Sequence, residues 1–227
     1  LKEPFKGNDK NHEAMMDMAL ARIRQLGAHE VGHTLGFAHN FAASTQDRAS
    51  VMDYPHPKYD IVDGVISLED AYAIGIGKWD KLTVQYSYGN PKASQSEAAF
   101  LQSIIKIADV ENLKFISDSD SRAAGGASAS GHLWDNGANP SKELVHILKV
   151  REIAMNQFSL DNIRSGEALS VLEDVFVPVY FAHRYQVEAT TKLVGGLEYE
   201  FLTKDGNQEF NTVGAFQQVE ALRNILK

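Results

Sequence analysis

The stretch HEVGHTLGFAHN, which begins at His29, restricts the fold through the spacing of its three histidines. His29 and His33 are four residues apart, so a helix places both on one face, about one turn from each other. His39 follows six residues later, and a straight helix would direct it elsewhere. The three imidazoles meet only if the chain turns sharply after the helix. Gly36 suits that turn, because glycine readily adopts the left-handed conformation that ends helices.

Three imidazoles brought together in this way predict a Zn²⁺ site with His29, His33 and His39 as ligands. Three protein ligands leave a fourth position open, which is typical of catalytic rather than structural zinc. Glu30 leaves the helix about 100° around from its neighbour, so it reaches a zinc-activated water as general base without binding the metal. The full HExxHxxGxxH pattern, with Gly36 as hinge, resembles the metzincin protease signature. The structural alternative is an amphipathic helix with surface histidines.

A second feature, Ser-Val-Met-Asp-Tyr over residues 50–54, follows shortly downstream. Metzincins carry a methionine-containing turn beneath the zinc, and Met52 matches it by position. In the astacin and serralysin branches, the tyrosine two residues later lies near the metal. This resemblance implies that Tyr54 either binds zinc in the free enzyme or donates a hydrogen bond to the developing oxyanion. Core packing of Met52 and burial of Tyr54 under the site are the alternatives. Asp53 departs from the histidine usual in those branches.

Longer stretches resemble a family of large, mostly uncharacterised bacterial zinc metalloproteases of the metzincin type. They are RQLGAHEVGHTLGFAHNFAAS, RASVMDYPHP, DAYAIGIGKWDKLTVQYSYG, FISDSDSR, GHLWDNGAN and HRYQVEA, and together they extend over nearly the whole chain. The resemblance implies an exported protein, extracellular or periplasmic, that acts on a polypeptide substrate. It also implies an upstream domain of the same parent chain.

Hydrophobic spacing predicts a mainly α fold with a few short strands. Helices are expected over residues 11–36, 67–88, 95–109, 141–158, 167–193 (interrupted at Pro178) and 213–226. Short strands are expected at residues 114–117 and 197–203, with a turn at 205–206. Residues 40–66 and 118–140 are expected to be long irregular connections.

We divide the chain into a zinc-binding catalytic part, residues 1–90, and a helical C-terminal subdomain, residues 91–227. Proteases of this type align their substrate along an edge strand that precedes the active-site helix. The residues before His29 instead read as polar coil and helix. We therefore expect the N-terminal sheet of the protease to be absent from this chain, and the isolated chain to hydrolyse peptides poorly.

Composition excludes several classes of function. The net charge of −8, from 30 acidic and 22 basic residues, argues against nucleic acid as the main partner. The chain has no cysteine, which excludes disulfides, thiol catalysis and cysteine–zinc sites. No uninterrupted apolar run is long enough to span a membrane.

The function predicted from these features is zinc-dependent endopeptidase activity. A non-catalytic module that binds a polypeptide or glycan on a degenerate protease fold is the first alternative, although an intact Glu30 argues against it. A zinc hydrolase of a non-peptide amide is the second. Cobalt or manganese would fit the same three ligands, because the order of metal affinities alone does not choose among them.

Several polar residues outside the motif have two interpretations. Asp118, Asp120 and Asp135 are candidate calcium ligands, but capping of the loop through their side chains is favoured. His132, with Trp134, is expected to pack a loop against a lobe or to line the cleft. His183 is expected to be a core histidine within a structural arginine network.

Overall fold

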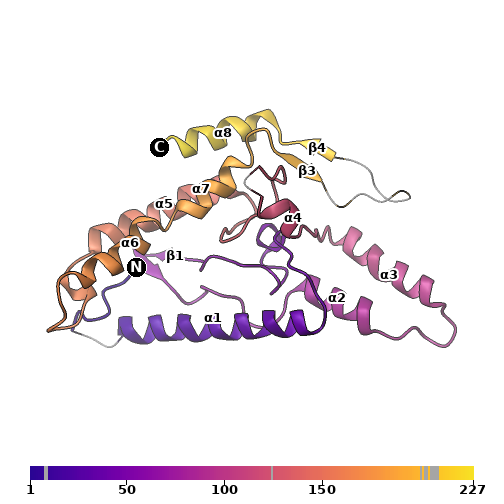
Figure 1. Ribbon diagram of the computed structural model, residues 1–227, viewed down its shortest axis with the longest axis horizontal. Helices are drawn as coiled ribbons and strands as arrows, with labels where there is room; N and C mark the ends of the chain where they lie inside the picture. The colour runs from indigo at the N-terminus through magenta and orange to yellow at the C-terminus, as the bar shows by residue number, and fades with distance from the viewer. Residues whose placement is uncertain (8–9, 124, 200, 202–203, 205–209) are drawn as a thin grey trace.

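The chain folds into a mainly helical, elongated molecule in the computed structural model, which confirms the predicted fold class (Figure 1). The structure describes residues 1–7, 10–123, 125–199, 201, 204 and 210–227. Helix α1 (Lys10–Thr34) runs along one long edge, and α8 (Ala215–Ile225) lies along the other. Between them pass α5 (Pro140–Gln157), α6 (Val171–Tyr180) and α7 (Arg184–Thr191).

Among the described residues, the β structure consists of two small antiparallel sheets of two strands each. Strands β1 (Asp60–Val62) and β2 (Val65–Ser67) form one, and β3 (Leu197–Tyr199) and β4 (Phe210–Thr212) form the other. The first lies in a segment that we expected to be irregular. Its two-residue turn, Asp63-Gly64, has positive φ at both residues, the conformation that Asp-Gly favours in tight hairpins.

Four further elements lie in or near the segment that follows α1. They are the 3₁₀ turn η1 (Ala43–Gln46), α2 (Lys78–Tyr88), α3 (Glu97–Val110) and α4 (Asp118–Ser121). A second 3₁₀ turn, η2 (Leu160–Asn162), lies instead beside the N-terminal residues, to which Ser159 and Asn162 are hydrogen-bonded. Ser96 caps α3 by accepting a hydrogen bond from Ala99 N. Asn139 caps α5 in the same way, and Pro140 occupies its first turn, where a missing N–H costs no helical hydrogen bond.

Three predictions about local structure were wrong. No helix begins at Ser67, which pairs in β2; Gly75 adopts a positive φ, and α2 begins only at Lys78. Residues 114–117 form no strand. Pro178 lies inside α6, and the break before α7 comes three residues later, at residues 181–183. The end of the predicted strand 197–203 (residues 200, 202 and 203) and the predicted turn at 205–206 lie outside the described residues.

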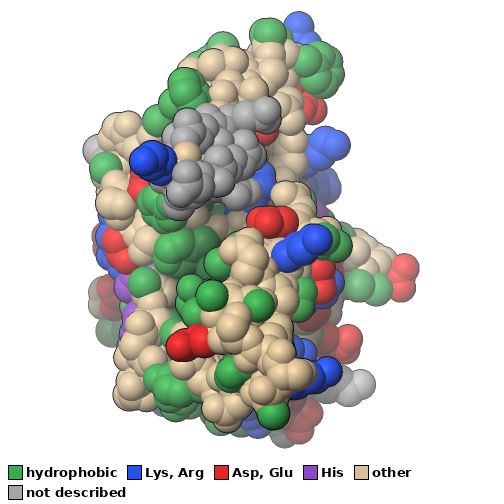
Figure 2. Space-filling model, turned by 90° about the vertical axis from the view of Figure 1, so that its right-hand side faces the viewer, with side chains coloured by type: hydrophobic (Ala, Val, Ile, Leu, Met, Phe, Trp, Pro, Cys, Tyr) green, Lys and Arg blue, Asp and Glu red, His purple; other side chains and the backbone are tan. Residues whose placement is uncertain are grey.

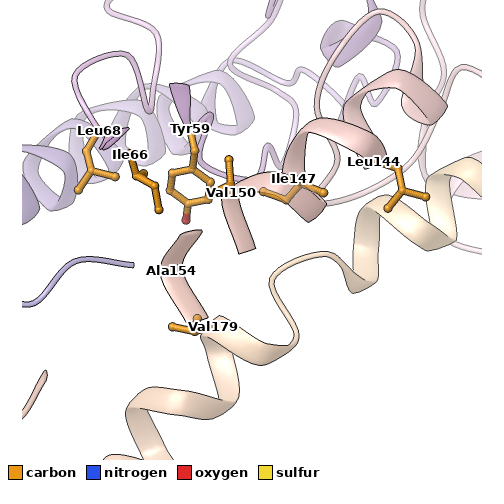
Figure 3. Packing of buried hydrophobic residues seen from close by; sticks show 8 residues of the cluster. All are labelled: Tyr59, Ile66, Leu68, Leu144, Ile147, Val150, Ala154 and Val179. Atoms are coloured by element: carbon orange, nitrogen blue, oxygen red, sulfur yellow. The ribbon is translucent and has the colours of Figure 1, made fainter. Parts of the chain in front are cut away.

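The main hydrophobic core joins the first hairpin to α5 (Figure 3). Tyr59 and Ile66 lie beside Val150 of α5, and Leu144 belongs to the same cluster farther along it. Ile66, Leu144 and Val150 are fully or almost fully buried. Methionines from the first half of α1 pack against the same cluster. The core therefore fixes one end of α1, while the histidines lie near its other end.

The surface is mixed in character. Figure 2 views the end of the molecule near α2 and α3, where hydrophobic side chains are interspersed with acidic and basic ones. Among the described residues, we find no helix with both the length and the apolar character needed to cross a bilayer.

Candidate metal centre

Helix α1 ends in a hydrogen-bonded turn that redirects the chain. Gly36, with φ of +88°, follows the helix end; its N–H donates to His33 O (2.9 Å), and Phe37 N–H donates to Gly32 O (3.1 Å). This pair of bonds is a Schellman motif, in which a left-handed residue closes a helix. The chain after Gly36 therefore turns back instead of continuing along the helix axis, as the spacing of the histidines requires.

The three histidines meet beyond this turn. The ring centroids of His29 and His33 are 4.6 Å apart, and those of His33 and His39 are 4.7 Å apart. One nitrogen from each ring lies within 4.8 Å of the other two. Among the described residues, these are the three side chains placed closely enough to share a metal ion.

The hydrogen bonds of the rings determine which nitrogen is available. Each Nδ1 lies 2.8–2.9 Å from an oxygen that can only accept: Val51 O for His29, Phe37 O for His33, and a carboxylate for His39. Each Nδ1 must therefore carry the proton, and each neutral ring keeps its lone pair on Nε2. Burial lowers the pKa of His29, which favours that neutral form.

This assignment leaves two lone pairs facing each other. His33 Nε2 and His39 Nε2 are 3.1 Å apart, and between two neutral rings with Nδ1 protonated no hydrogen lies between these atoms. His29 Nε2 is buried without any hydrogen-bond partner. Two nitrogens on one zinc ion would be about 3.3 Å apart, given Zn–N lengths of about 2.0–2.1 Å in a tetrahedral site. The donor set thus fits a metal cation, with zinc among those that it could hold.

Met52 lies directly under α1. Its side chain is 2% exposed, and a Cβ atom placed on Gly32 would lie 2.2 Å from the Met52 sulfur. The backbone just before Met52 is fixed by the buried carboxylate of Asp80, which accepts hydrogen bonds from Ser50 Oγ (2.5 Å) and Val51 N (2.9 Å). Since Val51 O accepts the Nδ1 proton of His29, Asp80 supports the first histidine through one intervening residue.

A family model described as Met-zincin matches residues 11–227. The chain belongs to the Met-zincin family. No curated protein and no solved structure matches it. The match covers both parts into which we divided the chain, and the boundary near residue 90 stays a prediction.

Tyr54 of this Met-zincin lies beside the histidines. Its ring centroid is 4.7 Å from that of His29 and 5.0 Å from that of His39. Trp134, for which we had two interpretations, packs against Tyr54. The backbone N–H of Trp134 donates to the backbone carbonyl of Tyr54 (2.8 Å), and the two ring centroids are 5.4 Å apart. Glu30 is exposed on α1 immediately after the buried His29, so its carboxylate is open to solvent.

The sequence did not indicate the partner of His39. Its Nδ1 donates to Asp118 Oδ2 (2.8 Å), and Asp118 lies 79 residues away at the start of α4. Arg122, one turn later, donates to the other oxygen of the same carboxylate. The nearby Asp120 has a different partner, since Tyr199 Oη donates to it (2.5 Å). The stretch FISDSDSR, which contains Asp118, resembles the family, but it gave no indication that Asp118 is the hydrogen-bond partner of a histidine.

The other two singled-out histidines lie apart from the metal-compatible group. Both ring nitrogens of His132 are buried without a hydrogen bond, and burial lowers its pKa to about 4. Glu188 approaches it only to 3.6 Å. His183 precedes α7, and burial, followed by the charge of Arg151, lowers its pKa. Arg151 is thus the arginine whose charge acts on His183, and the predicted arginine network stays a prediction.

A pair of buried carboxyls underlies the methionine turn. Asp53 accepts hydrogen bonds from Tyr54 N (2.7 Å) and Ser44 N (3.0 Å), yet burial raises its pKa well above the usual value, and the charge of Asp135 adds to this. Burial raises the pKa of Asp135 to about 7. Both side chains are 2% exposed. These two acids therefore favour their protonated forms in the folded protein.

A groove of about 830 Å³ lies elsewhere, between α1 and residues 68–76. Its lining includes Met18, Gln25, Tyr72 and Ile74, and none of the three histidines contributes to it. We do not assign the chemistry of the site to this groove.

Proposed function

We propose that this Met-zincin is a zinc-dependent endopeptidase whose metal is held by His29, His33 and His39. The observation that carries the proposal is the pair of Nε2 atoms 3.1 Å apart, beside a third buried Nε2 that has no partner. Membership in the Met-zincin family supports the same chemistry. A bound zinc would supply Lewis acidity, lowering the pKa of water and polarising a peptide carbonyl.

Glu30 has the role of general base in this proposal. It is exposed beside the buried His29, so it can accept a proton from the attacking water and deliver it to the leaving amine. Tyr54 lies close to two of the three rings, those of His29 and His39. Its hydroxyl is proposed to donate a hydrogen bond to the developing oxyanion. A polypeptide substrate and export from a bacterial cell stay predictions.

The variant Glu30→Gln tests the assigned chemistry. We expect both this variant and the unmodified protein to bind one zinc ion per chain, and the variant to lose nearly all hydrolysis of a peptide library. Cleavage products are identified by mass spectrometry over long incubations, so that slow turnover by the 227-residue chain is still measured. Glu13→Gln, the same substitution at another exposed position of α1, is the matched control.

The outcomes separate the alternatives. Full hydrolysis by Glu30→Gln would remove the glutamate from its role. Zinc binding without hydrolysis of peptides by the unmodified chain would favour a binding module, or a hydrolase of another amide if a library of non-peptide amides is cleaved instead. Failure of the unmodified chain to bind zinc would reject the metal site itself.

A further inference from the structure

The third histidine is supported differently from the other two. His29 and His33 donate their Nδ1 protons to backbone carbonyls, which are neutral and are fixed by the methionine turn and by the helix end. His39 donates its Nδ1 proton to the carboxylate of Asp118 (2.8 Å). A charged acceptor forms a stronger bond to an imidazole N–H than a neutral one does.

The fold brings Asp118 to His39 through the residues next to each of them. Asn40, which is fully buried, donates to Lys114 O (2.9 Å) and accepts from Ile116 N (3.2 Å). Phe41 N–H donates to Ile116 O (2.8 Å). Three hydrogen bonds thus join the chain directly after His39 to the chain directly before Asp118. The placement of the carboxylate is therefore a consequence of buried polar bonding rather than of a chance surface contact.

Arg122 fixes the orientation of the carboxylate. Its guanidinium donates to Asp118 Oδ1, which leaves Oδ2 for His39. The guanidinium carbon also lies 5.7 Å from the ring centroid of Tyr54 and 5.7 Å from that of Phe41. Arg122 therefore contacts both Asp118, which supports His39, and Tyr54, which lies beside the histidines.

We propose that Asp118 is a positioning residue for the metal centre: it holds His39 in the tautomer that presents Nε2 to the ion and strengthens that nitrogen as a ligand. The proposal rests on the zinc site described under the proposed function. A carboxylate that accepts the Nδ1 proton raises the electron density at Nε2, and loss of such a partner commonly weakens metal binding about 10–100-fold. Arg122 assists by keeping Oδ2 directed at the ring.

The test measures zinc affinity rather than activity. Asp118→Ala and Asp118→Asn are compared with the unmodified chain by competition for Zn²⁺ with a chromophoric chelator. Asp118→Ala is expected to bind zinc at least about 10-fold more weakly. Asp118→Asn is expected to lose several-fold, because an amide oxygen still accepts the Nδ1 proton but carries no charge. The visible spectrum of the Co²⁺-loaded forms should change in the same order.

Asp120→Asn is the matched control, because it removes the same charge from the same short helix and its partner is Tyr199. Its zinc affinity should be unchanged. Zinc affinities of both Asp118 variants equal to that of the unmodified chain would overturn the proposal and leave the proposed function intact. Absence of zinc binding by the unmodified chain would overturn both. If Asp118→Ala does not fold, Asp118→Asn decides, provided that its metal-free melting temperature matches that of Asp120→Asn.

Discussion

The sulfur of Met52 occupies the space that a side chain at Gly32 would need, because a Cβ atom there would lie 2.2 Å from it. Met52 is buried, so the thioether has little room to move away. Gly32→Ala should therefore destabilise the protein by about 1–2 kcal/mol, despite the helical preference of alanine. Chemical denaturation of the metal-free protein measures this change.

Gly27→Ala provides the comparison within the same helix. No atom lies within 4 Å of the position of its Cβ, so the substitution should stabilise α1 by about 0.5–1 kcal/mol. In a double-mutant cycle, Gly32→Ala should cost less in a Met52→Ala background than in the unmodified chain, because the clash is removed. Equal effects of alanine at both glycines would show that the contact with Met52 is not what requires glycine at residue 32.

The second prediction concerns His33 and the facing lone pairs. Zinc should raise the melting temperature of the unmodified chain, because a ligand that binds only the folded state stabilises it. In His33→Ala, zinc should have little effect, since two histidines remain. Without metal, His33→Ala loses the hydrogen bond from Nδ1 to Phe37 O but also the repulsion at 3.1 Å from His39, so its unfolding free energy should fall by no more than about 1 kcal/mol.

Metal analysis and thermal melts with and without zinc test this prediction, with His12→Ala on the exposed part of α1 as control. A favourable coupling between residues 33 and 39 in a double-mutant cycle of the metal-free alanine variants would contradict the assignment of both Nε2 lone pairs, since it would mean that the two rings share a hydrogen bond.

The local part of the site could be predicted from sequence because it depends on short-range geometry. The separation of His29 and His33 fixes their common face, and Gly36 supplies the left-handed residue of the turn. The same holds for the long periodic helices, since α3, α5 and α8 begin and end within a few residues of their predicted limits. The fold class followed from these helices.

The supporting shell could not be predicted, because it depends on contacts between distant segments. Asp118 meets His39 across 79 residues, and Asp80 reaches Ser50 across 30. The false helix start at Ser67 has a related cause. A short pattern of capping residues also occurs outside helices, and here pairing of β2 with β1 competes successfully with it. Tertiary packing, which a single sequence does not display, decides each of these cases.

The third prediction tests Tyr54 within the proposed function. Tyr54→Phe keeps the ring beside His29 and His39 and removes only the hydroxyl. If the hydroxyl donates to the oxyanion, the rate of peptide cleavage should fall about 100-fold while zinc affinity stays unchanged. A fall in zinc affinity would instead make the hydroxyl a metal ligand in the free enzyme. Tyr72→Phe, which lies by the groove and not by the histidines, controls for loss of a phenol elsewhere.

The fourth prediction follows from the buried carboxyl of Asp135, whose pKa is raised from 3.8 to about 7, chiefly by burial. Between those pH values the folded protein holds a proton that the unfolded chain has released. The contribution of this group to stability is therefore complete below about pH 4 and is lost as the pH rises to about 7. Asp135→Asn should remove this loss, because the amide stays neutral throughout.

We expect the difference in unfolding free energy, Asp135→Asn minus unmodified, to increase from about pH 4 to about pH 7 by a few kcal/mol and then to level off. Buried histidines with lowered pKa, such as His132, contribute the opposite slope, but they are present in both proteins and cancel in the difference. Denaturation curves are measured in the presence of a chelator, so that pH-dependent zinc binding does not contribute to the unfolding free energy. Asp63→Asn, in the exposed β1–β2 turn, is the control. A difference that does not vary with pH would show that Asp135 is ionised in the folded protein at pH values well below 7.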